Sequence, residues 1–249
     1  MFQYLNIFGV KLGTFPLFAG AGLLAIAFCV AYQVKNFNFD NDTETKVMVC
    51  IPLSVLFGTI TAYFSDVIFR GGIRALFSPW GYGVTFYGWL IGCVFFYLIY
   101  SYVVHIKTIF LLNCFLPSFA IAQALGRIGC FCGGCCFGVP VNWGVCYPEG
   151  SYPYLIYGDI PILPVQLLES FYLFLIFFIL IIKIKFSYRA AIYLILVPCG
   201  RFVFEFLRGD NRGSIGMQIL SPAQLFSIVL ILFGFILFLY CKRQEVRLP

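Results

Sequence analysis

The chain has 249 residues, of which 62% are hydrophobic and only 10% are charged, and its mean hydropathy is +0.97. This balance excludes an ordinary water-soluble domain, and the long unbroken apolar runs favour helices over the alternating strands of a β-barrel. The formal net charge of +6 comes from dispersed basic residues without a Lys/Arg-rich tract, so we expect no nucleic-acid partner. The composition predicts an all-α fold, a polytopic helical bundle that forms a single membrane domain over residues 1–249.

Apolar segments near the ~20 residues that span a bilayer recur along the chain. They predict about seven transmembrane helices, at residues 13–34, 47–66, 84–104, 108–125, 165–185, 189–207 and 220–241. Residues 35–46 form a polar connector. The stretch 126–164 is rich in Gly, Pro, Cys and Tyr, and we expect it to form a small, partly extracytoplasmic head region.

The basic residues predict an orientation. With the C-terminus in the cytoplasm, the residues on the inner side are mostly lysines at helix ends, whereas those on the outer side or within the membrane are nearly all arginines. Lysine at a helix end is a topology signal, but the planar fork of arginine binds phosphate through two hydrogen bonds. We therefore expect an outer N-terminus, a cytoplasmic C-terminus and a ligand site towards the outer face.

The stretch 126–138, Gly-Arg-Ile-Gly-Cys-Phe-Cys-Gly-Gly-Cys-Cys-Phe-Gly, follows a long apolar segment and contains a single arginine, Arg127. An arginine near lipid is costly and normally pairs with an anion. Glycine allows backbone N–H groups to approach a ligand closely. The anion available at that depth is a phospholipid head group.

A second charged motif lies in the segment 189–207, where Arg201, Glu205 and Arg208 follow one another at offsets of four and seven residues. This spacing places them on one helical face and predicts an Arg201–Glu205 ion pair. The alternative to a functional site is a structural ion pair with an arginine that reaches the interface.

Three further motifs open predicted helices: Pro164 to Glu169, Ser221 to Phe226 and Gly83 to Gly92. Ser221 is a plausible helix cap, and Gln166 and Gln224 could simply form hydrogen bonds between helices. In the third motif, Tyr87 and Trp89 could be aromatic residues of the membrane interface.

Taken in this order, the motifs resemble the bacterial prolipoprotein diacylglyceryl transferases. The specific elements are the Gly-Arg-x-Gly-x-Phe start at 126–131, the Arg-Phe-x-x-Glu-Phe-x-Arg run at 201–208, the Pro-x-Gln-Leu-x-Glu phrase at 164–169 and the Ser-x-x-Gln phrase at 221–224. The resemblance implies a seven-helix enzyme of the bacterial inner membrane. Its reaction transfers the diacylglyceryl group of phosphatidylglycerol to a lipoprotein-precursor cysteine and releases glycerol phosphate, without a cofactor.

The resemblance also implies roles for individual residues. Arg127 would bind the phosphate, Arg201 would act at the reacting centre, and Arg208 would hold the head group or guard lateral access. Tyr87 stands where the family has histidine and is a candidate catalytic residue. The implied substrate-binding residues also include Gly129, Gly134, Gly138, Gln166, Glu169, Glu205 and Asp210.

The chain departs from the family signature at Cys130, where the family has Asn, and at Cys135, where it has Glu. With Tyr87 in place of histidine, the phospholipid half of the site is expected to be kept and the acceptor half rebuilt. Two alternatives remain open: a divergent relative with another acceptor, such as a glycan, and a catalytically inactive lipid-binding scaffold.

Five of the eleven cysteines fall outside the predicted helices: Cys130, Cys132, Cys135, Cys136 and Cys146. Their spacing does not match the common zinc patterns, so no metal is expected. The remaining possibilities are a disulfide within this group, a covalent nucleophile at Cys135 or Cys136, and small neutral side chains that line the site.

Overall fold

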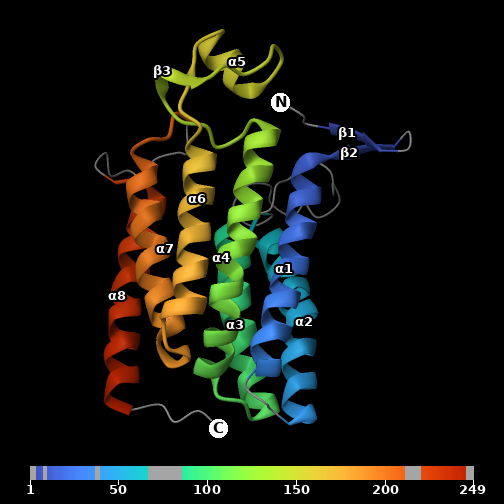
Figure 1. The fold of residues 1–249 in the computed structure, drawn as a ribbon, viewed down its shortest axis with the longest axis vertical. Coiled ribbons are helices and arrows are strands. Elements are labelled where there is room, and N and C mark those ends of the chain that lie inside the picture. Colours follow the sequence, from blue (N-terminus) through green and yellow to red (C-terminus); the bar gives the residue numbers. More distant parts are fainter. Residues whose placement is uncertain (1–3, 8–9, 37–39, 67–85, 211–219, 245–249) are drawn as a thin grey trace. The chain divides into compact units, whose positions relative to one another are not determined.

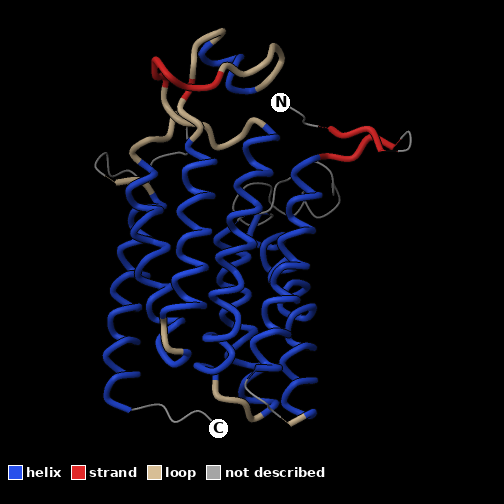
Figure 2. The backbone as a smooth tube through the Cα atoms, in the orientation of Figure 1, coloured by secondary structure: helices blue, strands red, loops and turns tan. Residues whose placement is uncertain are grey.

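The computed structural model describes residues 4–7, 10–36, 40–66, 86–210 and 220–244. These residues are mainly helical, as Figures 1 and 2 show. The long helices are α1 (Thr14–Asn36), α2 (Asn41–Asp66), α3 (Phe86–Val104), α4 (Thr108–Gly133), α6 (Val165–Phe178), α7 (Arg189–Glu205) and α8 (Pro222–Gln244). Two short elements join α6 to α7, the π-helical turn Ile179–Lys183 and the 3₁₀ turn Phe186–Tyr188.

Six of these helical segments are long and apolar enough to cross a membrane: α1, α2, α4, α6 with its π-helical turn, α7 with the preceding 3₁₀ turn, and α8. The remaining predicted segment, 84–104, coincides with α3. Its apolar part, Gly92–Val104, is shorter than the other six segments. The predicted all-α polytopic membrane fold is therefore confirmed, while the count of seven spanning helices stays a prediction.

Contacts divide the chain into two compact units, residues 29–112 and residues 1–28 with 113–249. In the first unit, α2 and α3 pack closely through small residues. A Cβ atom built on Gly92 would lie 1.7 Å from Thr61 Oγ1, and one on Gly58 would lie 2.7 Å from Cys93 Sγ. Close backbone approach of this kind is typical of helices that associate in lipid.

In the second unit, α6 and α7 approach each other equally closely. A Cβ atom on Gly200 would lie 2.0 Å from the ring of Tyr172, and Tyr172 Oη donates a hydrogen bond to the Leu196 carbonyl at 2.7 Å. On the other side of α6, Ser170 Oγ donates to the Ala124 carbonyl of α4 at 2.9 Å. These contacts hold α4, α6 and α7 side by side (Figure 1).

The predicted boundary between the fourth apolar segment and the head region is wrong. We expected the helix to end at residue 125 and the cysteine-rich stretch to lie outside it, but α4 continues to Gly133 and includes Cys130 and Cys132. One of the glycines that suggested irregular backbone, Gly129, is accommodated by packing, since it lies against Phe15 and Phe18 of α1. Tertiary contacts override the low helix propensity of glycine here.

Between α4 and α6 the chain forms a small folded segment with the strand β3 (Pro140–Val145) and the short helix α5 (Tyr152–Tyr157) (Figure 2). Its core consists of the buried residues Phe137, Tyr147 and Ile162, against which Tyr157 packs. An antiparallel hairpin that the sequence analysis did not predict, β1 (Tyr4–Ile7) and β2 (Val10–Gly13), precedes α1.

Candidate functional site

A cluster of charged side chains from α4, from α7 and from the residues after α7 surrounds the buried carboxylate of Glu169. Glu169 is located at the start of α6 and is only 4% exposed. One of its oxygens pairs with Arg127 Nε of α4, and the other accepts a hydrogen bond from Arg201 Nη1 of α7 at 2.8 Å. Glu169 therefore connects the predicted phosphate ligand Arg127 with Arg201, the residue predicted to act at the reacting centre.

The second carboxylate of the cluster, Glu205, belongs to α7 itself. Its Oε2 accepts a hydrogen bond from Arg201 Nη2 at 2.7 Å, which confirms the intrahelical ion pair predicted from the spacing. Arg201 thus has a carboxylate on each terminal nitrogen, which fixes its side chain in one orientation.

Arg208 is the most buried of the three arginines, with a side chain only 2% exposed. It lies three residues beyond the end of α7, where its Nε and Nη2 donate to the two carboxylate oxygens of Asp210 at 2.9 and 3.0 Å. Its Nη1 lies 4.0 Å from Glu169 Oε1 and, among the described residues, has no hydrogen-bond partner. A buried guanidinium donor without a hydrogen-bond partner is costly, which makes this nitrogen a candidate contact for an anion.

Backbone pairing positions Arg208. The segment after α4 runs antiparallel to the segment after α7, with the bridge between Gly138 and Arg208 at its centre. Val139 N donates to the Leu207 carbonyl at 3.1 Å, and Gly209 N donates to the Phe137 carbonyl at 3.0 Å. A Cβ atom on Gly138 would lie 2.5 Å from the Leu163 carbonyl oxygen, so only glycine permits this pairing.

The three predicted ligand glycines thus have identifiable roles in the fold. Gly129 allows α1 to approach α4, and Gly138 allows three backbone segments to meet. Gly134 follows the last residue of α4 with a φ of 71°, the left-handed conformation that commonly ends a helix. Whether their backbones also contact a substrate stays a prediction.

Gln166, one turn before Glu169 on α6, is fully buried. Its Nε2 donates to the Cys135 carbonyl at 2.7 Å and lies 3.2 Å from Tyr147 Oη. Gln166 therefore attaches the cysteine-containing loop to α6, a role close to the interhelical bonding expected for it. Tyr147 was missed by the sequence analysis, because one tyrosine among several in the head region carries no distinguishing pattern.

The other glutamine, Gln224, acts within its own helix. Its backbone N–H donates to Ser221 Oγ at 3.2 Å, and its side-chain oxygen accepts from Ser221 N at 2.9 Å. This reciprocal pair is a capping box at the start of α8. The predicted Ser221 cap is confirmed, and the interhelical role considered for Gln224 is replaced by capping.

Three thiols converge beside the arginines. The Sγ atoms of Cys130, Cys135 and Cys136 all lie within 4.8 Å of one another. The described structure has no disulfide between them. Cys136 adopts a φ of 60°, which is uncommon for a residue other than glycine.

Hydrogen bonds from the thiols of Cys130 and Cys135, together with the positive charges of Arg208 and Arg127, lower the pKa of Cys136. A thiolate is the nucleophilic and metal-binding form of cysteine, so this position is chemically distinct from the buried cysteines of the helices. Cys132 and Cys146 do not belong to the group of three.

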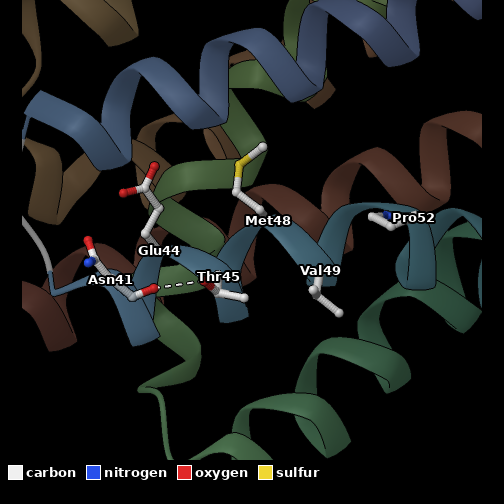
Figure 3. Close-up of a pocket in the computed structure, with 6 residues that line it drawn as sticks. All are labelled: Asn41, Glu44, Thr45, Met48, Val49 and Pro52. Atoms are coloured by element: carbon white, nitrogen blue, oxygen red, sulfur yellow. Dashed lines mark hydrogen bonds between the residues drawn. The ribbon is translucent and has the colours of Figure 1, made fainter.

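One predicted residue, Tyr87, cannot be placed at this site. Tyr87 falls within α3, but its side chain lies outside the part of the chain that is described. Figure 3 shows a pocket in the unit of residues 29–112, lined by Asn41, Glu44, Thr45, Met48, Val49 and Pro52 of α2. None of the predicted site residues lines it, so the candidate site is the charged cluster around Glu169.

Comparisons with known proteins identify the family of the chain. The family model described as prolipoprotein diacylglyceryl transferase matches residues 3–240. The phosphatidylglycerol–prolipoprotein diacylglyceryl transferase of Clostridium tetani is 29% identical over 238 residues, with 94% of each chain covered. The transferase 2 of Clostridium perfringens is 28% identical over 94% of this chain and 92% of its own, and the Streptococcus agalactiae enzyme is 27% identical over 97% and 98%. With its helical membrane fold and buried arginine cluster, the chain belongs to the prolipoprotein diacylglyceryl transferase family.

Proposed function

We propose that this chain transfers the diacylglyceryl group of phosphatidylglycerol to the cysteine thiol of a prolipoprotein. Relatives that carry the corresponding name match it over nearly their whole length. The observation that carries the proposal is the buried donor of Arg208, Nη1, which lies beside the Arg127–Glu169–Arg201 network. Phosphate is the anion whose geometry best matches converging guanidinium groups.

The reaction breaks the bond between the glycerol carbon of the diacylglyceryl group and the phosphate oxygen. Negative charge grows on the leaving glycerol phosphate as this bond breaks. Arg127, Arg201 and Arg208 would stabilise that charge in a site shielded from water, where such interactions are stronger than in solution. The sulfur of the acceptor forms the new bond to the same carbon.

The carboxylates have a positioning role in this proposal. Three arginines face three carboxylates, Glu169, Glu205 and Asp210, so the cluster is formally neutral without a ligand. Glu169 is shared between two arginines, which holds their side chains in place before the lipid binds. Because the arginines are held in advance, little reorganisation is needed when the phosphate enters.

The site would be located at the outer leaflet of the bacterial cytoplasmic membrane. This follows from the charge distribution, which favours an outer N-terminus and a cytoplasmic C-terminus. The segment with β3 and α5 would then form the extracytoplasmic head. In this arrangement Tyr87 would act on the acceptor side, and Gly129, Gly134 and Gly138 would shape the backbone around the lipid.

The test is a reconstituted reaction. Full-length protein in vesicles receives phosphatidylglycerol labelled in its diacylglyceryl group, together with a peptide that contains the lipoprotein cysteine and, in a parallel reaction, a cell-envelope glycan fraction. We expect label on the peptide and release of glycerol phosphate. Arg201→Ala should reduce the rate about 100-fold or more, the usual cost of removing a donor to a developing anion.

Arg189→Met provides a matched control. Arg189 is a buried arginine of the same helix, and it donates to the backbone carbonyls of Ile181 and Ile184. The rate per folded molecule should therefore be unchanged. Label on the glycan alone would show that the acceptor is a glycan and not the prolipoprotein cysteine. Lipid binding without any transfer would overturn the enzymatic proposal in favour of a scaffold.

A further inference from the structure

The three thiols next to the arginine cluster have the arrangement of a metal-binding site. The Sγ atoms of Cys130, Cys135 and Cys136 lie within 4.8 Å of one another, although their sequence spacing matches no common zinc motif. With zinc–sulfur bonds of about 2.3 Å, tetrahedral ligands are separated by roughly 3.8 Å. The thiols could bind one ion after only small rotations of their side chains.

The end of α4 creates this arrangement. Cys130 is in the last turn of the helix, and Cys135 N donates to its carbonyl at 3.1 Å as the chain leaves the helix. The left-handed residues Gly134 and Cys136 then reverse the direction of the backbone. A non-glycine residue in this conformation is strained, and such strain concentrates at functional sites.

A neighbouring side chain fixes the loop that carries the thiols. The Nε2 group of the fully buried Gln166 donates to the Cys135 carbonyl at 2.7 Å, and Tyr147 Oη lies 3.2 Å from the same nitrogen. Metal ligands are usually held by such outer hydrogen bonds, which set their orientation before the ion binds.

The number of ligands and their exposure indicate the type of site. Structural zinc sites have four protein ligands, whereas catalytic sites have three and leave one position for water or substrate. Here three thiols converge; Cys135 is exposed, and Cys130 and Cys136 are half-buried. The group is therefore open on one side.

The cluster is also adjacent to the proposed lipid site. Arg127 precedes Cys130 by one helical turn, and Gln166 precedes Glu169 by one turn on α6. Both Arg127 and Arg208 interact electrostatically with Cys136. A zinc ion with three thiolates has one net negative charge, which these arginines would offset.

We propose that Cys130, Cys135 and Cys136 bind a zinc ion whose fourth position accepts the thiol of the acceptor cysteine. The proposal rests on the proposed diacylglyceryl transfer. Zinc deprotonates a coordinated thiol, and the proton passes to solvent. The bound thiolate then attacks the glycerol carbon of the lipid: the carbon–sulfur bond forms, the carbon–oxygen bond breaks, and its electron pair leaves with glycerol phosphate.

Such a site accounts for the unusual residues of this chain. The resemblance implies Asn and Glu at positions 130 and 135, and histidine at the position of Tyr87. A bound zinc ion would activate the acceptor thiol without a carboxylate or imidazole base. No oxidant or reductant is required, because the metal does not change its oxidation state.

The experiment measures metal binding directly. Full-length protein is purified in detergent, loaded with zinc, dialysed and assayed for zinc content. Cobalt(II) replaces zinc in a second sample, where thiolate-to-cobalt absorption reports sulfur ligands. We expect about one ion per chain in the wild type and less than ~0.1 in Cys130→Ser, Cys135→Ser and Cys136→Ser, since each variant removes a ligand.

Cys132→Ser and Cys146→Ser are the matched controls, because both residues lie in the same region outside the group of three. They should retain the zinc content and the cobalt spectrum. The melting temperature of each variant, measured without metal, separates the loss of a ligand from misfolding, and Cys130→Ala provides a second test if the serine variant does not fold.

Two outcomes would overturn the metal site: wild-type protein that retains no zinc, or equal loss of zinc in the Cys132→Ser control. Diacylglyceryl transfer at the wild-type rate by a zinc-free Cys135→Ser variant would reject the catalytic role and leave the proposed function intact. Stoichiometric zinc in a wild-type protein that transfers no lipid would support the site and reject the proposed function.

Discussion

Two arginines near opposite ends of α7 have different partners: Arg189 is buried, and Arg201 is partly buried. Arg189, at the first residue, donates to the carbonyls of Ile181 and Ile184 and lies over the ring of Phe186. Arg201, twelve residues later, pairs with two carboxylates from α6 and α7. Backbone carbonyls satisfy a charge locally and keep it in place. A carboxylate that is shared by two arginines can instead release one of them. The released guanidinium group can then bind an anion.

The largest effect is expected from removing the shared carboxylate. Glu169→Gln would leave Arg127 and Arg201 as partly buried charges with incomplete pairing, at a cost of up to about 3–5 kcal/mol in unfolding free energy. Thermal unfolding in detergent would measure this change. Glu205→Gln, which affects only Arg201, should cost less. Equal stability of both variants would contradict the central role of Glu169.

A variant at Arg208 tests function more than stability. Arg208→Lys keeps the charge but loses the paired hydrogen bonds to Asp210 and the donor Nη1. We expect the transfer rate to fall about 100-fold, which corresponds to roughly 2.7 kcal/mol of barrier. Transfer kinetics with labelled phosphatidylglycerol would measure it. A Lys variant with the wild-type rate would show that a point charge suffices there.

A variant at Arg189, the first residue of α7, should change stability more than function. Arg189→Met removes two hydrogen bonds to carbonyls and is expected to lower the unfolding free energy by about 1–3 kcal/mol. The transfer rate per folded molecule should not change. Chemical denaturation and a rate normalised to folded protein would separate the two quantities. A loss of rate without a loss of stability would mean that the two ends of α7 do not differ in function.

The smallest effect is predicted for the cap of α8. Ser221→Ala removes the oxygen that accepts the Gln224 N–H and should cost about 1 kcal/mol. The melting temperature should fall by a few degrees, with no change in the KM for lipid. Ser221→Asp, which can cap the helix equally well, should restore the stability. If it does not, the hydroxyl has another role than capping.

The sequence predicted much of the fold, because membrane helices depend on local composition. All seven predicted apolar segments coincide with a helix, and the ion pair between Arg201 and Glu205 follows from spacing alone. The end of α4 was predicted eight residues too early, because the glycines were interpreted as loop residues. Gly129 in fact lies within the helix and packs closely against α1, which only contacts distant in sequence reveal.

The composition and motif order of this chain were sufficient to indicate a membrane protein and its family, because long apolar segments and short charged motifs are local properties of the sequence. The charged motifs did not reveal that Arg127, Glu169 and Arg201 meet, or that one donor of Arg208 has no hydrogen-bond partner among the described residues. They also did not reveal that three thiols converge. These features arise where the C-terminal ends of α4 and α7 lie beside the N-terminal end of α6. Side chains from different helices meet only after the helices have packed, and no single helix encodes that arrangement.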